Sequence, residues 1–233
     1  MRKMSGGSFM LVIFIALMAY NSISSGRFEN PSQWLQETLM RLPAIVIGIT
    51  FHEFAHAFSA YKLGDMTPKS QGRVTLNPIS HIDPFGILVL VFVGFGWGRP
   101  VQVNPYAFPK NRRLSNLVVD VAGVATNFVI AFICAALLYF IHDRLLFTIV
   151  YNIIAINLVL MLFNLLPIPP LDGFGVLTEI FDLRRFSWYR PLYSNGMIIL
   201  MVVVFFGIAG RLLGPGVEAV MKFLLGVWAP LLL

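Results

Sequence analysis

Long apolar runs separated by short polar stretches dominate the chain and predict membrane-spanning helices. Most of these runs have the roughly 20 residues that an α-helix needs to cross the hydrocarbon core of a bilayer. The predicted spans cover residues 5–25, 39–61, 114–141, 145–166, 196–210 and 217–233. The first run resembles a signal peptide as well, because Arg2 and Lys3 precede it and small residues follow Ser22, but we expect a retained anchor. We therefore expect an all-α polytopic membrane protein with about six transmembrane helices.

The pattern changes between the second and third predicted spans. Residues 71–77 and 99–104 alternate with a period of two, and each segment runs into Asn-Pro, which is typical of short strands. Between them, residues 85–97 form an uncharged run that is too short to cross a bilayer. We expect a small β-sheet with a membrane re-entrant segment here. A plain short helix over 85–97 is the alternative, because periodicity does not separate the two.

Composition supports the membrane assignment and excludes several functions. The chain is 58% hydrophobic and only 12% charged, which a soluble domain of 233 residues does not need for its core. The net charge is +6, yet the basic residues fall between apolar runs, so no nucleic-acid partner is expected. Cys134 is the only cysteine, which excludes a zinc site built on several cysteines. We expect one membrane-embedded domain over 1–233, with a catalytic core at about 36–175 and accessory helices at 5–25 and 194–233.

The distribution of Lys and Arg predicts the orientation in the membrane. Six spans place both termini on one side, and that side carries twelve of the basic residues against four on the other. Positive residues mark the cytoplasmic side. We therefore expect a multi-pass plasma-membrane protein with both termini in the cytoplasm. His56 lies six residues before Lys62, about 9 Å at helical rise, so a site at His56 lies nearer the cytosol.

Three polar residues interrupt the second predicted span. Within the uncharged stretch between Arg41 and Lys62 stand His52, Glu53 and His56. Ionisable groups at membrane depth are costly and usually functional. In a helix the two histidines project from one face a turn apart, which is the H-E-x-x-H arrangement of two zinc ligands and a general base. The structural alternative is that both histidines are hydrogen-bond partners of neighbouring helices.

A catalytic zinc ion needs a third protein ligand. Asp172 is the candidate, because it follows three prolines at positions 167–170 that must unwind the end of the fourth predicted span. That unwound end lies on the same side of the membrane as His56. Glu179 and Asp182 are rivals by residue type, but they sit in a polar loop and look solvated.

Together these motifs resemble the site-2 protease family of zinc intramembrane metalloproteases. The resemblance rests on residues 52–56 (HEFAH) and 164–173 (NLLPIPPLDG), and it covers about residues 42–175. Residues 72–78, 96–105 and 122–127 also resemble bacterial members of that family. Val124 stands where the family often carries Pro, and no PDZ-like domain is present, so the chain resembles a minimal member.

The resemblance implies one zinc ion held by His52, His56 and Asp172, with Glu53 as the base that activates water. It also implies that Asn127 and Asn164 face the site and contact the substrate backbone or the oxyanion. A zinc-dependent intramembrane endopeptidase would act on a single-span membrane protein or a signal-peptide remnant embedded in the lipid bilayer. The transmembrane helix of such a substrate must unwind, and segment 71–77 or 99–104 is expected to receive it as an added strand.

Two other classes of function fit parts of the pattern. The broken helix at 167–170 and the polar residues in the span also suit a transporter, which would be expected to show an inverted repeat that the sequence lacks. A non-catalytic membrane scaffold would have no use for Glu53. Substituting Glu53 by Gln distinguishes the protease, the transporter and the scaffold, because only a protease keeps its zinc and loses cleavage.

Overall fold

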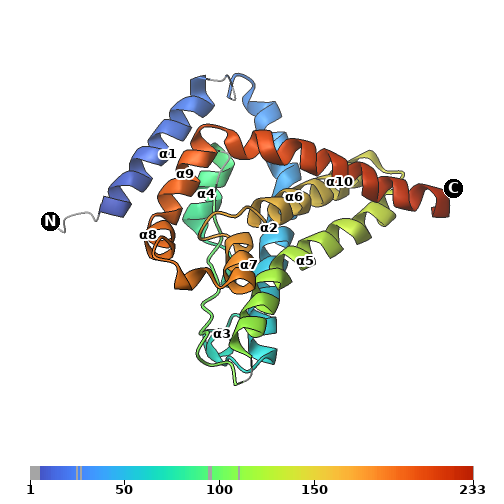
Figure 1. Cartoon of the computed structure of the whole chain (residues 1–233). Coiled ribbons are helices and arrows are strands. Elements are labelled where there is room, and N and C mark those ends of the chain that lie inside the picture. The colour runs from blue at the N-terminus through green and yellow to red at the C-terminus, as the bar shows by residue number, and fades with distance from the viewer. Residues whose placement is uncertain (1–5, 25, 27, 94–95, 110, 233) are drawn as a thin grey trace.

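Three long helices, α2 (Pro31–Lys62), α5 (Arg112–Leu138) and α6 (Arg144–Asn164), pack against one another at the centre of the protein (Figure 1). This arrangement is that of a computed structural model, which describes residues 6–24, 26, 28–93, 96–109 and 111–232. All three helices are long and apolar enough to cross a membrane. The predicted spans 39–61, 114–141 and 145–166 are therefore confirmed as helices.

Each of the three central helices begins at a polar residue that caps it. The side chains of Asn30, Asn111 and Asp143 accept a hydrogen bond from a main-chain N–H in the first turn of α2, α5 and α6. Pro31 occupies the first position of α2, where its missing N–H costs nothing. Because of this start, α2 extends eight residues further towards the N-terminus than the predicted span 39–61.

Close packing of α5 against α6 depends on small residues. Ala131 and Ala135 on α5 have no exposed surface, and neither do Ile154 and Leu158 on α6. Small side chains let two helix backbones approach closely within a membrane. The same core includes Leu224 of α10 (Ile208–Leu232), which packs across α6 (Figure 1).

The predicted count of six spans is not confirmed. Among the described residues, four helices are long and apolar enough to span a membrane: α2, α5, α6 and the 208–229 part of α10. The helix α9 (Gly196–Phe205) has ten residues, about 15 Å at helical rise, against a hydrocarbon core of about 30 Å. The other apolar helix, α1 (Gly6–Ser24), is also shorter than those four, and Arg2 and Lys3 before it lie outside the described residues.

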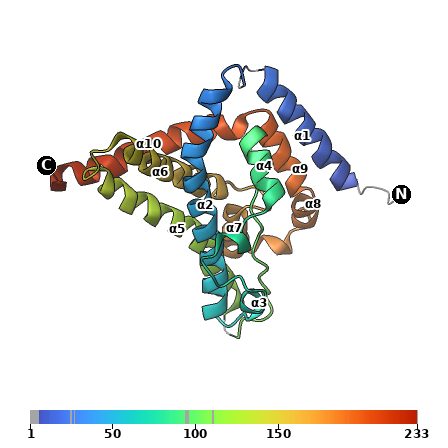
Figure 2. The ribbon, with the colours of Figure 1, turned by 180° about the vertical axis from the view of Figure 1, so that it is seen from behind.

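The break between the last two helices lies earlier than predicted. The sequence pattern predicts a turn at 211–216, but those residues lie inside α10. The chain turns at Gly207 instead, whose φ of +66° favours glycine. In Figure 2, α1, α4 (Pro84–Val93) and α9 lie on the opposite side of α2 from the C-terminus.

The predicted unwound segment after α6 is confirmed. The helix α6 ends at Asn164, and seven residues separate it from α7 (Asp172–Phe181), so Asp172 is the first residue of a new helix. After α7 come a short 3₁₀ helix, η2 (Leu183–Arg185), and α8 (Tyr189–Ser194). The helix α7 packs against α5, which brings its first turn towards α2 (Figure 1).

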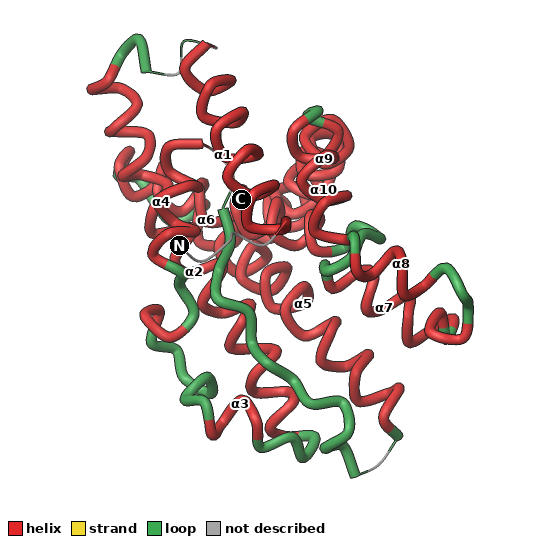
Figure 3. The backbone as a smooth tube through the Cα atoms, turned by 90° about the vertical axis from the view of Figure 1, so that its left-hand side faces the viewer, coloured by secondary structure: helices red, strands yellow, loops and turns green. Residues whose placement is uncertain are grey.

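The predicted small sheet is wrong for the residues that the structure describes. The connection from α2 to α5 contains α3 (Thr67–Ser70), a 3₁₀ helix η1 (Pro78–Ser80) and α4, with no strand drawn in Figure 3. In the described part of this connection, one antiparallel bridge joins Ile82 to Gly98. The alternative of a short helix within 85–97 is confirmed by α4, although residues 94–95 lie outside the described part. Re-entry of this segment into the membrane stays a prediction.

The backbone groups of the two predicted strands bond elsewhere. In 71–77 the N–H groups of Arg73 and Thr75 donate to Pro68 O and Arg73 O, so the segment forms local turns. Segment 99–104 has its N–H groups directed at other elements: that of Arg99 donates to His81 O at 2.7 Å, and that of Asn104 to Asp65 Oδ2 at 2.7 Å. The alternating pattern predicts strands, but carbonyl and carboxylate acceptors replace the strand partner.

Candidate metal centre and active site

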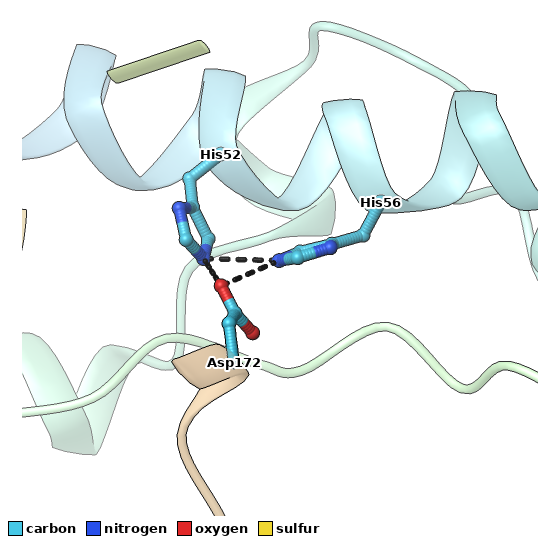
Figure 4. Close-up of side chains that lie close together, drawn as sticks. All are labelled: His52, His56 and Asp172. Atoms are coloured by element: carbon cyan, nitrogen blue, oxygen red, sulfur yellow. Dashed lines mark hydrogen bonds and ion pairs between the residues drawn. The ribbon is translucent and has the colours of Figure 1, made fainter. Parts of the chain in front are cut away.

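Two imidazoles of α2 and the carboxylate at the start of α7 converge on one point (Figure 4). His52 Nε2 and His56 Nε2 are 3.0 Å apart, and each lies 3.3 Å from Asp172 Oδ2. His52 and His56 are one helical turn apart, so both project from the face of α2 that α7 approaches. The structure therefore brings together the three residues that the sequence predicts as metal ligands.

The second nitrogen of each imidazole determines which atom is left for a ligand. His56 Nδ1 lies 2.7 Å from the main-chain oxygen of Val119, which only accepts, so Nδ1 carries the proton. His52 Nδ1 lies 2.7 Å from Asn127 Oδ1, and the same amide donates through Nδ2, so this Nδ1 also carries the proton. Both Nε2 atoms then present lone pairs towards Asp172, as in metal-binding histidines that donate their other N–H.

The donor atoms fit a zinc ion. Three lone-pair atoms face one another with no hydrogen among them, and Asp172 Oδ2 is buried without a hydrogen-bond partner. A cation removes the repulsion and the unsatisfied acceptor together. Tetrahedral zinc with ligand distances of about 2.0–2.1 Å separates neighbouring ligand atoms by roughly 3.3 Å. The observed separations of 3.0–3.3 Å match that spacing.

Gly123 on α5 makes room for the two imidazoles. A Cβ atom at this position would lie 2.6 Å from His52 Cε1 and would overlap His56 Nε2. Real Cβ contacts of this kind do not occur, so only glycine allows α5 to approach α2 here while both rings keep their positions. Sequence reasoning missed Gly123, because a glycine inside an apolar helix carries no chemical signal.

Comparison with known proteins agrees with this geometry. The chain is 38% identical over 202 residues to the Bacillus subtilis protein named "Putative zinc metalloprotease YwhC", covering 81% of this chain and 92% of that protein. The chain belongs to the site-2 protease family. Proteins named Rip2 carry the same description: the one from Mycolicibacterium smegmatis is 26% identical over 75% of this chain and 70% of its own length. Rip2 of Mycobacterium tuberculosis H37Rv is 27% identical over 82% and 78%.

Neither a family model nor a solved structure matches the chain. Membership of the site-2 protease family identifies a zinc-dependent metalloprotease, and the apolar helices identify a membrane protein. The cofactor is zinc, and His52, His56 and Asp172 form a group that could hold it.

Glu53 lies beside the ligand pair on α2 and is half-buried. Its Oε2 accepts a hydrogen bond from the main-chain N–H of Val101 at 2.9 Å. Val101 belongs to segment 99–104, which is far from Glu53 in the sequence. The carboxylate that the H-E-x-x-H pattern predicts as a base is therefore in contact with the connection between α2 and α5.

The two asparagines predicted for this site-2 protease differ in their surroundings. Asn127 is fully buried, and its Nδ2 donates to Gly48 O at 3.2 Å and to Asn157 Oδ1 at 2.8 Å. Both amide hydrogens are thus used within the protein. Asn164 Nδ2 donates to Leu160 O in its own helix, outside this network. Asn157, which sequence reasoning did not assign to the site, joins it because the fold places α6 against α5.

Glu179 is buried, contrary to the prediction that it is solvated. It is 4% exposed, and its Oε1 accepts from Arg184 at 2.6 Å and from Asn116 of α5 at 2.8 Å. The pKa of Arg184 is raised, because its guanidinium donates a hydrogen bond to the Glu179 carboxylate. Arg113 of α5 donates to the main-chain oxygens of Glu179 and Ile180. These contacts attach the far end of α7 to α5.

Proposed function

We propose that this protein is an intramembrane endopeptidase that cleaves peptide bonds within or near the transmembrane segments of its substrates. The observation that carries the proposal is the convergence of His52, His56 and Asp172 inside the helix bundle, with both histidines in an apolar span. A metal centre within a span acts on substrates that reside in the bilayer. Family membership supports the hydrolytic chemistry.

The residues have separate roles in this proposal. His52, His56 and Asp172 hold the zinc ion, with their orientations fixed by Asn127, by Val119 O and by the start of α7. Zinc, when bound, supplies a Lewis acid that lowers the pKa of water to about 7 and polarises the scissile carbonyl. Glu53 takes the proton of the attacking water and delivers it to the leaving amine, so that one water is consumed for each bond cleaved.

Substrate binding requires a locally unwound helix. A transmembrane helix satisfies its own backbone groups, so its carbonyls become accessible only where those bonds open. Segment 99–104 does not offer the unwound stretch an added strand, because the N–H groups of Arg99, Val101 and Asn104 already donate to His81 O, Glu53 and Asp65. Segment 71–77 is no longer a candidate, because its N–H groups form local turns. The proposed substrates are single-span membrane proteins or signal-peptide remnants.

The proposed location is the plasma membrane, with both termini and the nearer end of the site facing the cytosol. The excess of Lys and Arg in the connection between α2 and α5 supports the cytosolic position of the nearer end of the site, whereas the position of both termini rests on the six predicted spans. Asn127 is proposed to orient His52 rather than to bind substrate, because both its amide hydrogens are already used.

The test uses purified protein in liposomes with a single-span reporter that carries a helix-breaking residue in its transmembrane segment. The wild type is expected to cleave the reporter and to lose activity when zinc is chelated. Glu53→Gln is expected to keep its zinc and to lose cleavage. Zinc flux across the liposomes that persists in Glu53→Gln, without cleavage by the wild type, would support a transporter and overturn the proposal.

A further inference from the structure

The contact between Glu53 and Val101 connects the proposed base to a segment that lies 48 positions away in the sequence. We infer that the main-chain N–H of Val101 positions the Glu53 carboxylate, and that Arg73 holds Val101 in place for this purpose. The inference rests on the proposed function, in which Glu53 is the base. Val101 and Arg73 are positioning residues, because neither is placed against the reacting atoms.

A carboxylate at the end of a glutamate side chain needs such a contact. Three side-chain torsions separate its oxygens from α2, and the half-buried Glu53 interacts with Arg73 and His56 electrostatically but forms no salt bridge among the described residues. A hydrogen bond from a main-chain amide to a carboxylate is charge-assisted and stronger than a neutral one. At 2.9 Å it holds Oε2 and leaves Oε1 to receive the proton. The N–H of Val101 thus selects which oxygen acts.

The position of Val101 is itself fixed by the residues that precede it. Arg73 is 8% exposed, and its guanidinium donates to Arg99 O at 3.2 Å, to Pro100 O at 3.4 Å and to Ser80 O. The N–H of Arg99 donates to His81 O. The two residues before Val101 are therefore held by one buried guanidinium and by the end of η1.

The segment is also held on the far side of Val101. The N–H of Asn104 donates to Asp65 Oδ2, and Asp65 has no exposed surface. With anchors at Arg99, Pro100 and Asn104, the direction of the Val101 N–H is determined by the connection between α2 and α5 and not by α2. Burial lowers the pKa of Arg73, with a further contribution from Arg99, but a guanidinium keeps its charge and its fork of donors.

Lysine does not replace arginine in this role. The planar guanidinium reaches three carbonyl oxygens at once, whereas an ammonium on a flexible stem lacks the same fork. Arg73→Lys keeps the charge and removes the geometry, so it loosens the segment without leaving a buried position empty. It is the variant of choice where a change at Val101 prevents folding.

The experiment compares Val101→Pro with Gln102→Pro in the full-length protein in liposomes. Proline at 101 removes the N–H that contacts Glu53. Gln102 is exposed and its N–H forms no hydrogen bond among the described residues, so proline there leaves the contact with Glu53 in place. Zinc content, kcat and KM are measured for each variant and for Arg73→Lys with the same single-span reporter.

For Val101→Pro we expect one zinc per chain, an unchanged KM and a kcat lowered by about 10–100-fold, because a misplacement of about 1 Å can cost 100-fold. Arg73→Lys is expected to show the same pattern with a smaller loss, and Gln102→Pro to match the wild type. A purely structural role would instead lower zinc content or change KM. If Val101→Pro is not recovered from the membrane, Arg73→Lys decides the question by the same criteria.

Three results would overturn the inference: a wild-type kcat in Val101→Pro, an equal loss in Gln102→Pro, or loss of zinc in Val101→Pro or Arg73→Lys. Glu53→Gln separates this failure from failure of the proposed function. If Glu53→Gln is inactive while Val101→Pro has a normal kcat, only the positioning role is wrong. If Glu53→Gln cleaves the reporter, the proposed base is wrong as well.

Discussion

The two helices that supply the metal ligands are built in opposite ways. The helix α2 has 32 residues, carries both histidines well inside it and packs against α5 and α6. The helix α7 has ten residues and carries Asp172 at its first position. The imidazoles are oriented at the ring itself, by Asn127 and Val119 O, whereas α7 is attached to α5 through Glu179, about two turns from the ligand.

The protein therefore combines two ligands on one long helix with a third ligand from a distant segment of the chain. Two histidines one turn apart on a long helix project from the same face however the rest of the chain folds. Asp172 reaches them only if α6 ends where it does and α7 docks on α5. Substitutions on the two sides should therefore have different consequences, and the following comparisons are ordered from the largest expected effect to the smallest.

Removal of a ligand from either helix should have the largest effect. Asp172→Asn and His56→Ala are each expected to abolish zinc binding and to reduce cleavage to background, since two remaining ligands do not retain a catalytic zinc. Asp182→Asn is the matched control, because Asp182 lies outside the site and has a φ of +52° that asparagine tolerates. Zinc content measured by atomic emission checks all three variants. Full zinc content in Asp172→Asn would show that α7 supplies no ligand to the metal centre.

The second largest effect is expected from a side chain that crowds the two histidine rings. Gly123→Ala places a methyl group against both rings, so zinc affinity should fall by on the order of 100-fold, the upper range for residues that orient ligands. Gly210→Ala on α10 is the control, since no atom lies within 4 Å of the added methyl. Zinc titration with a competing chelator measures both, and equal affinities for the two variants would contradict the close approach of α5 to α2.

Loss of the Asn127 amide should have a smaller effect. Asn127→Ala removes the acceptor of the His52 N–H, and zinc affinity should fall by about 10–100-fold. Asn164→Ala should keep the affinity of the wild type, because the Asn164 amide bonds within α6. Competitive zinc titration and cleavage assays check both variants. Cleavage lost in Asn164→Ala with zinc retained would instead assign Asn164 to substrate binding.

The attachment of α7 should be the least sensitive. Glu179→Gln weakens the contact with Arg184 and should lower zinc affinity by roughly 10-fold, because the effect reaches Asp172 only through α7. Glu218→Gln is the control, because Glu218 forms an ion pair of the same 2.6 Å distance with Lys222 on the surface of α10. Exposed pairs of that kind contribute little to stability, because water screens the two charges. Competitive zinc titration compares the two variants, and an effect in Glu218→Gln as large as in Glu179→Gln would show that α7 is not held through Glu179.

The features that the sequence predicts well are those encoded by local patterns. Apolar runs bounded by polar caps predict α2, α5 and α6, and the prolines at 167–170 predict the end of α6. The HEFAH pattern places two histidines on one face, and the unwound segment makes Asp172 their partner. Each of these inferences needs only the neighbouring residues or the helical period.

The features that were missed depend on contacts between distant segments. The alternation in 99–104 predicts a strand, yet its N–H groups bond to His81 O, Glu53 and Asp65. Glu179 looks solvated in a polar stretch, but α7 extends past it and buries it against Asn116. The roles of Gly123 and Asn157 become apparent only when α2, α5 and α6 pack against one another.

X-ray absorption at the zinc K edge of the purified protein tests the central claim most directly. The account predicts one zinc per chain with two imidazole nitrogens and light oxygen ligands at about 2.0–2.2 Å, and no sulfur. The His52→Ala protein should show no such spectrum at equal zinc concentration. A sulfur ligand at about 2.3 Å, or a spectrum unchanged in His52→Ala, would contradict a zinc ion held by His52, His56 and Asp172.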